Sequence, residues 1–94
     1  MYGWKKYWLT VTKDDLEKAI ENVKAYYYDP LTECLVAVSA NRQYEGFEAC
    51  GVCTLRFNGG SFTASKEMVK LIDLFCGRKY GTLRKMLPKR VYFY

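Results

Sequence analysis

The spacing of the apolar residues changes along this chain, and the order of those changes constrains its fold more than any other feature. In residues 4–11, apolar side chains fall on one side at alternate positions, which predicts a strand. In residues 13–28 they recur three and four residues apart, which predicts an amphipathic helix. Thr12 suits the N-cap of that helix, and Pro30 suits a stop soon after its end. The chain therefore opens with a strand and a helix.

The same two spacings recur in the rest of the chain. The segments that we expect to form strands are 33–40, 47–57 and 89–94. The segments that we expect to be helical are 65–76 and, as a short turn, 82–87. The strands 33–40 and 47–57 would pair as a hairpin. Ser65 would cap the longer helix, and Gly77 would end it.

The predicted order, β-α-β-β-α-(α)-β, is typical of one small α+β fold. In fewer than a hundred residues it indicates the ferredoxin-like split βαβ sandwich. In that fold two helices cover one face of a four-stranded antiparallel sheet, and the other face is open. A chain of 94 residues has room for a single domain, so we expect residues 1–94 to form one.

The excess positive charge lies in the last fifth of the chain. Residues 1–76 hold nine basic and ten acidic residues, whereas residues 77–94 hold six basic residues and no acidic ones. The six are Arg78, Lys79, Arg84, Lys85, Lys89 and Arg90. Such a concentration favours a phosphate backbone, an acidic protein surface or an anionic membrane as the partner. The alternative is a solvated face that keeps the protein soluble.

The open face of the predicted sheet would expose aromatic and basic side chains together. Trp4, Lys6 and Trp8 share one side of the first strand, and Arg56 lies on the matching side of the third. Indoles on which bases stack, beside cations that hold phosphates, are typical of surfaces that bind single-stranded RNA or DNA. The alternative is an interface with a second copy or with an unrelated protein.

A helix-turn-helix is a second nucleic-acid hypothesis. Residues 67–87 read as a helix, a glycine-containing turn and a short basic helix. The turn "GRKYG" is longer and more charged than the compact type, so a basic connector to the last strand is the more ordinary interpretation.

The four cysteines, Cys34, Cys50, Cys53 and Cys76, leave three alternatives. Four thiolates could form a tetrahedral zinc site, but the sequence has one C-x-x-C and not two. We therefore expect structural thiols, with Cys53 and Cys76 in the core and Cys50 on the opposite side of the strand from Cys53. A disulfide is the third alternative.

The sequence has no signature of catalysis. It has no histidine, the commonest general base, and "FNGGSFTAS" lacks the Gly-Lys-Ser/Thr ending of a P-loop. We therefore expect no enzymatic activity, no cofactor and no metal. The chain has no apolar run of about 18 residues, and its start has no signal-like apolar region, so we expect no membrane span and a cytoplasmic location.

These observations lead to two functional hypotheses. The first is a small binding protein for single-stranded nucleic acid or for a nucleoprotein, with contacts from the sheet face and the basic end. The second is a protein-protein interaction module or inhibitor, of the kind that viruses and mobile elements encode, that docks on a host nucleoprotein machine. A symmetric homodimer is compatible with both.

Overall fold

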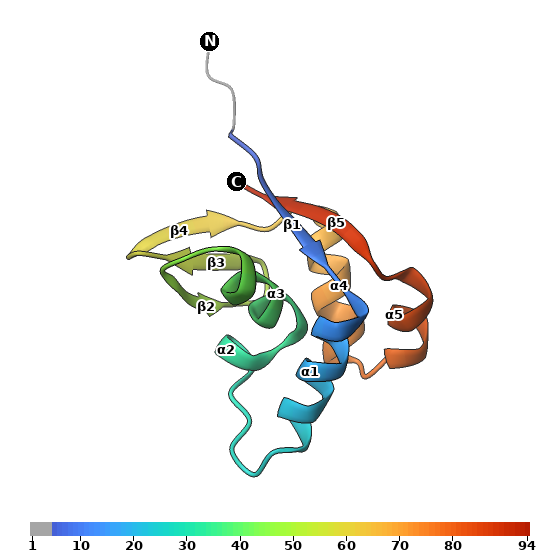
Figure 1. Ribbon diagram of the computed structural model, residues 1–94. Helices are drawn as coiled ribbons and strands as arrows, with labels where there is room; N and C mark the ends of the chain where they lie inside the picture. The colour runs from blue at the N-terminus through green and yellow to red at the C-terminus, as the bar shows by residue number, and fades with distance from the viewer. Residues whose placement is uncertain (1–4) are drawn as a thin grey trace.

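The computed structural model, which describes residues 5–94, consists of helices and antiparallel strands (Figure 1). The strands are β1 (Tyr7–Val11), β2 (Phe47–Cys50), β3 (Thr54–Phe57), β4 (Gly60–Thr63) and β5 (Lys89–Phe93). The helices are α1 (Lys13–Lys24), α2 (Pro30–Glu33), α3 (Leu35–Gln43), α4 (Lys66–Cys76) and α5 (Tyr80–Met86). The predicted α+β class is confirmed. Within residues 5–94, no helix has the length and apolar character needed to cross a membrane.

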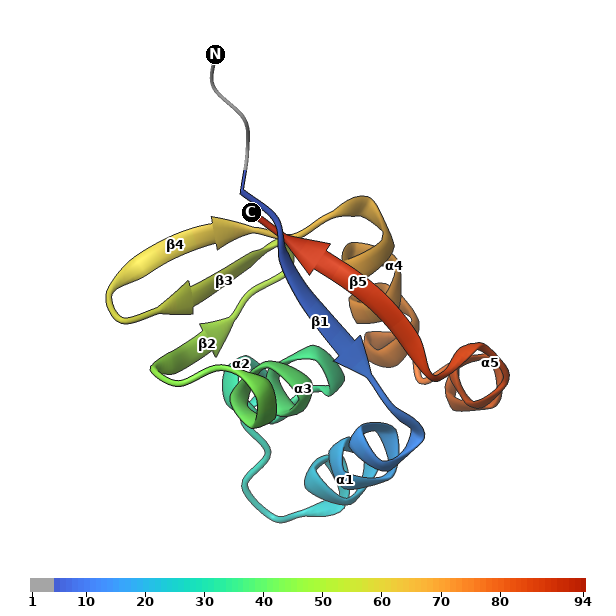
Figure 2. The same ribbon diagram turned by 45° about the horizontal axis from the view of Figure 1, so that its top comes forward.

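The strands form two antiparallel sheets that meet near the carboxyl end (Figure 2). β1 pairs with β5, and β2, β3 and β4 form a three-stranded sheet in that order. Thr63 and Tyr94 exchange backbone hydrogen bonds of 2.5 and 2.8 Å, and Ala64 bridges Phe93. The end of β4 therefore runs beside the end of β5. The outer faces of the two sheets join there into one continuous surface.

The expected strand over residues 33–40 is wrong. The segment forms the end of α2 and most of α3, and its residues Leu35, Val36 and Ala37 are buried. When a short apolar segment is buried on all sides, the spacing of its apolar residues does not distinguish a strand from a helix. The Ser39 hydroxyl donates to the Leu35 carbonyl one helical turn earlier. Because α3 occupies the place of a strand, no single four-stranded sheet forms, and the ferredoxin-like arrangement is not confirmed.

The expected strand over residues 47–57 is two strands. The chain turns at residues 51–53, so β2 and β3 form a hairpin, and a second tight turn leads from β3 into β4. That second turn has Asn58 at φ 49° and Gly59 at φ 80°. Two successive positive φ angles match the right-handed twist of paired strands, which is why Asn-Gly is common in hairpins. The strand β4, which follows this turn, is not among the predicted strands.

The caps of α1 and α4 lie at the predicted residues, but α1 ends at Lys24 and not at residue 28. Thr12 and Asp15 form a reciprocal capping box at the start of α1, and the Ser65 hydroxyl accepts from the Met68 amide at the start of α4. Gly77 ends α4, and the expected turn over residues 82–87 lies within α5 and its C-cap.

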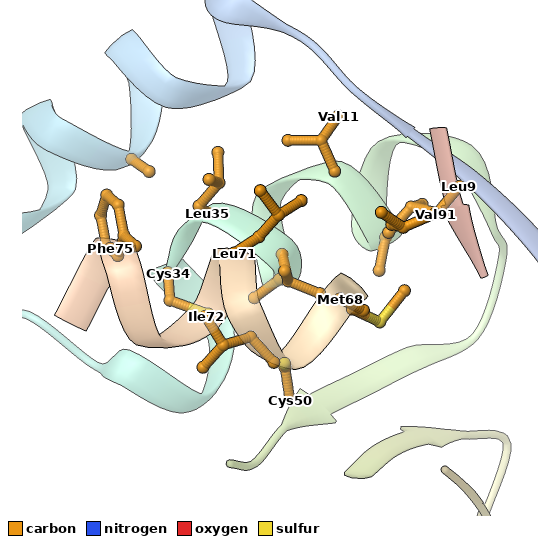
Figure 3. Close-up of a cluster of buried hydrophobic side chains, with 14 of the residues drawn as sticks. Leu9, Val11, Cys34, Leu35, Cys50, Met68, Leu71, Ile72, Phe75 and Val91 are labelled. Atoms are coloured by element: carbon orange, nitrogen blue, oxygen red, sulfur yellow. The ribbon is translucent and has the colours of Figure 1, made fainter. Parts of the chain in front are cut away.

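The core has two adjoining parts. In one, Leu9, Val11 and Val91 of the β1–β5 sheet pack with α3 and with the apolar stripe of α4 (Figure 3). The other is aromatic and lies between the sheets. There the Phe93 ring stacks on Phe57, with centroids 5.2 Å apart, and on Tyr7, at 5.4 Å. With its inner face packed in this way, the β1–β5 sheet presents only its outer face to solvent.

Candidate binding surface

Four side chains interleave on the outer face of β1 and β5, and we call them the outer ladder: Lys6, Tyr92, Trp8 and Arg90. The Lys6 ammonium lies 4.5 Å from the centroid of the Tyr92 ring. The Tyr92 and Trp8 ring centroids are 5.3 Å apart, and the Arg90 guanidinium lies 4.2 Å from the centroid of the Trp8 ring. Cations and π faces thus alternate, and each cation is attracted by the quadrupole of the ring beside it.

Strand register explains why these residues come together. Trp8 lies opposite Tyr92, and Thr10 lies opposite Arg90. Side chains on a strand alternate between its faces, so Trp8, Arg90 and Tyr92 share the outer face, while Leu9 and Val91 face the core. Trp8 is 41% exposed. The structure therefore places Lys6, Trp8 and Arg90, predicted from sequence, in one surface. The predicted Trp4 lies outside the described residues.

Side chains from the end of α3 cover the free edge of β1. The Thr10 backbone N–H donates to the Gln43 side-chain oxygen at 2.9 Å, and the Gln43 side-chain nitrogen donates to the Thr10 carbonyl at 2.7 Å. Arg42 donates to the same Thr10 carbonyl at 2.9 Å, and the Tyr44 hydroxyl donates to the Trp8 carbonyl at 2.6 Å. These bonds replace those of a neighbouring strand, so they hold the backbone beneath the outer ladder and reduce the room for another strand to add.

A shallow cavity of about 300 Å³ adjoins the outer ladder. Trp8, Arg90 and Tyr92 line it together with Lys89 and Val91 of the same strand. Glu67, on the first turn of α4, completes the lining. Nothing in the sequence joins Glu67 to this surface, because its position near the cavity depends on how α4 packs beside β5.

The basic residues near the carboxyl end do not form one patch. Lys89 and Arg90 belong to the cavity, whereas Arg78 and Lys79 lie in the turn between α4 and α5. The other two are on α5, where Arg84 donates to the Glu17 carboxylate at 3.0 Å and Lys85 is exposed. Within residues 5–94, Arg84 is the member of the six that forms an ion pair.

Arg56 lies far along the same outer surface from the outer ladder. It is exposed on β3 opposite Ser61, next to the Asn58-Gly59 turn. The end of β4 lies between β3 and β5, so Arg56 would meet an extended ligand some distance from Trp8.

The cysteines take different positions from those expected. All four are free thiols; Cys34 and Cys50 are buried, and Cys53 and Cys76 are exposed. Cys53 is outside the core because it lies in the turn between β2 and β3, and Cys76 is outside because α4 ends there. Across the described part of the chain, no three His, Cys, Asp or Glu side chains are grouped so as to hold a metal ion.

A second exposed apolar group lies between α1 and α2, at the opposite end of the molecule from the carboxyl terminus (Figure 1). Tyr26 is 90% exposed and Tyr27 is 84% exposed, and their rings contact each other edge to face at 4.7 Å. Leu31, at the start of α2, is also exposed. Sequence reasoning placed Tyr27 on the buried stripe of a longer helix, but α1 ends at Lys24, so Tyr27 is free of that stripe.

Comparisons of this chain with models of protein families, with curated proteins and with solved structures find no match.

Proposed function

We propose that this chain is a non-enzymatic protein that binds single-stranded nucleic acid in the cytoplasm through the outer face of β1 and β5. The observation that carries the proposal is the outer ladder, in which partly exposed rings share one surface with cations that form no ion pair within residues 5–94. A strand of RNA or DNA offers the two complements of such a surface, because its bases have π faces and its phosphates are anionic.

The contacts divide between the two kinds of side chain. The Arg90 guanidinium lies over the Trp8 ring, 4.2 Å from its centroid, so a base can stack on its other face while its N–H groups donate to a neighbouring phosphate. Lys6 and Lys89 then stand on either side to hold phosphates. Arg78, Lys79 and Lys85 lie farther away and act mainly by attracting a polyanion toward the protein.

The test is binding of a fluorescent oligouridine of about ten nucleotides, measured by anisotropy over a range of salt concentrations. The double variant Lys6→Gln/Arg90→Gln removes two cations of the outer ladder. Its matched control, Lys13→Gln/Lys70→Gln, removes two exposed cations from α1 and α4.

We expect the association constant of the unmodified protein to fall steeply with salt. The Lys6→Gln/Arg90→Gln variant should bind more weakly, with a log–log salt slope shallower by about 1.4, since each phosphate contact contributes about 0.7. The control should keep most of the affinity. Equal losses in the two variants, or binding that ignores salt, would refute the proposal.

Docking on a protein is the second candidate, and the exposed Tyr26, Tyr27 and Leu31 group favours it. Tyrosine is enriched in binding hot spots, and a pair of tyrosines so exposed has little to contribute to folding. In this case the chain is an interaction module or inhibitor that docks on a nucleoprotein machine. A pull-down from nuclease-treated lysate separates the candidates. Retention of a protein that depends on Tyr26 and Tyr27, and not on Lys6 and Arg90, favours docking.

A further inference from the structure

Glu67 is the one acidic residue in the lining of the outer-ladder cavity. It is exposed on the first turn of α4, which lies beside β5 (Figure 2), and it shares the cavity lining with Lys89 and Arg90. Its carboxylate forms no hydrogen bond or ion pair with any other residue between 5 and 94. A carboxylate in a cationic cavity that is not bonded to those cations is available to a ligand.

The chemistry of the cavity restricts that ligand. Trp8 and Tyr92 supply aromatic walls, Lys89 and Arg90 supply positive charge, and Glu67 supplies a group that only accepts hydrogen bonds. Its volume of about 300 Å³ is at the small end of ligand sites, which suits one base rather than several. The preferred base is therefore one whose edge offers hydrogen-bond donors to a carboxylate.

Among the four bases of RNA, guanine offers two such donors side by side. Its N1–H and its 2-amino group can meet both oxygens of one carboxylate, in the bidentate manner of an arginine. Uracil has a single N3–H between two carbonyl oxygens, which a carboxylate repels. Adenine and cytosine each have an amino group next to a ring nitrogen that is itself an acceptor.

We propose that the outer-ladder cavity binds a guanine base of a single strand and that Glu67 selects guanine by accepting from its Watson–Crick edge. This inference rests on the proposed function, and it adds base selectivity to what would otherwise be a sequence-independent surface. The flanking phosphates remain bound by Lys6, Lys89 and Arg90.

A simpler role for Glu67 makes the opposite prediction. An acidic residue in the first turn of a helix interacts favourably with the helix dipole. If that is its whole role, Glu67 only repels a polyanion, and Glu67→Gln strengthens binding of every oligonucleotide. If Glu67 accepts from guanine, Glu67→Gln weakens binding of an oligonucleotide that contains guanine and strengthens binding of one that does not.

The experiment measures affinities for oligouridine and for the same strand with one central guanosine or one central inosine. Inosine keeps N1–H and lacks the 2-amino group, so it offers one donor in place of two. The proteins are the unmodified chain, Glu67→Gln and the charge-matched control Glu21→Gln, which changes an exposed glutamate of α1. Thermal unfolding of each protein checks that the variants are folded.

We expect the unmodified protein to bind the guanosine strand roughly tenfold more tightly than oligouridine, with the inosine strand between them. Glu67→Gln should abolish this preference, and Glu21→Gln should keep it. If the unmodified protein binds all strands equally, or if Glu67→Gln strengthens guanosine binding, the selectivity is overturned while the proposed function stands. Absence of binding to any strand at low salt overturns both.

Discussion

At the scale of single residues, Asp15 differs most from what its place in the sequence indicates. By position it is an acid of the first turn of α1, yet it is 4% exposed and joins α1 to α3. Arg42 donates to both of its oxygens at 2.9 and 2.7 Å, and the Thr12 amide and the Ser39 hydroxyl donate as well. Burial alone would raise the pKa of Asp15, but these hydrogen bonds hold it below its ordinary value. The sequence could not predict the network, because Arg42 and Ser39 lie in the segment assigned to a hairpin.

Asp15 should make the stability of the fold depend on acid pH. A carboxyl whose pKa is lowered by folding contributes stability above its unfolded pKa, near 3.8, and the contribution is lost as the pH falls through the folded pKa. We expect Asp15→Asn to lower the free energy of unfolding by about 2 kcal/mol at pH 7, where the carboxylate accepts charged hydrogen bonds. The difference from the unmodified protein should shrink at pH 3.

Urea denaturation at the two pH values measures this effect. Asp14→Asn is the control, because Asp14 is the exposed neighbour of Asp15 in the same turn. An equal loss of stability in the two variants would contradict the role given to the buried network.

The thiols should divide into two classes by access. The neighbouring Cys50 thiol and the amides at the start of α3 hold the pKa of Cys34 below its ordinary value, against the effect of burial. Both of these thiols are buried, however, and only Cys53 and Cys76 are exposed. A thiol reagent at pH 8 should therefore react quickly with two groups and slowly with two. The variant Cys53→Ser/Cys76→Ser should lose the fast phase, and four equal rates would show that the cysteine placement is wrong.

At the scale of elements, the sequence predicts whether an amphipathic segment is a helix or a strand, but it does not do so for a segment that is buried on most sides. The apolar stripes and caps of α1 and α4 and the alternation of β1 and β5 are one-sided patterns, and these elements are found where the sequence indicates. α3 is buried on most sides, so its apolar run resembles a buried strand. The turn between β2 and β3 has no strong turn residue besides Gly51, so the two strands read as one.

The turn that leads from α3 into β2 depends on Gly46. Its φ is 78°, and a Cβ there would meet the Asn58 side chain. The Gly46 carbonyl also accepts a hydrogen bond from the Asn58 backbone N–H at 2.9 Å, so the turn cannot move freely away from Asn58. We expect Gly46→Ala to lower the free energy of unfolding by more than about 1 kcal/mol.

Gly81→Ala is the matched control for that substitution. Gly81 lies in α5, and a Cβ there has nothing within 4 Å. Alanine should therefore stabilise the helix by up to about 1 kcal/mol. Thermal unfolding of the two variants should show shifts of opposite sign; shifts of the same sign would contradict the backbone geometry assigned to residue 46.

At the scale of the whole molecule, the residues predicted to form one exposed surface of rings and cations lie together only in part. The parity of β1 and β5 places Lys6, Trp8 and Arg90 together, and such parity can be read from residue numbers. The packing of the two sheets and of α4 separates Arg56, Arg78 and Lys79 from those three residues. The same packing brings Glu67 close to them. Edge pairing through β1 is an unfavourable route to the homodimer, because α3 side chains occupy that edge.

The central claim is that the Trp8 surface receives a single strand of nucleic acid. The chain has two tryptophans, so Trp4→Phe leaves Trp8 as the only indole, and its fluorescence reports directly on stacking at the outer ladder. The decisive measurement is the titration of this variant with oligouridine at low and at high salt. We expect saturable quenching of Trp8 fluorescence, with a midpoint that moves to higher oligonucleotide concentration as salt is added. If the Trp8 emission of the folded protein stays unchanged during the titration at low salt, nucleic-acid binding at this surface is contradicted.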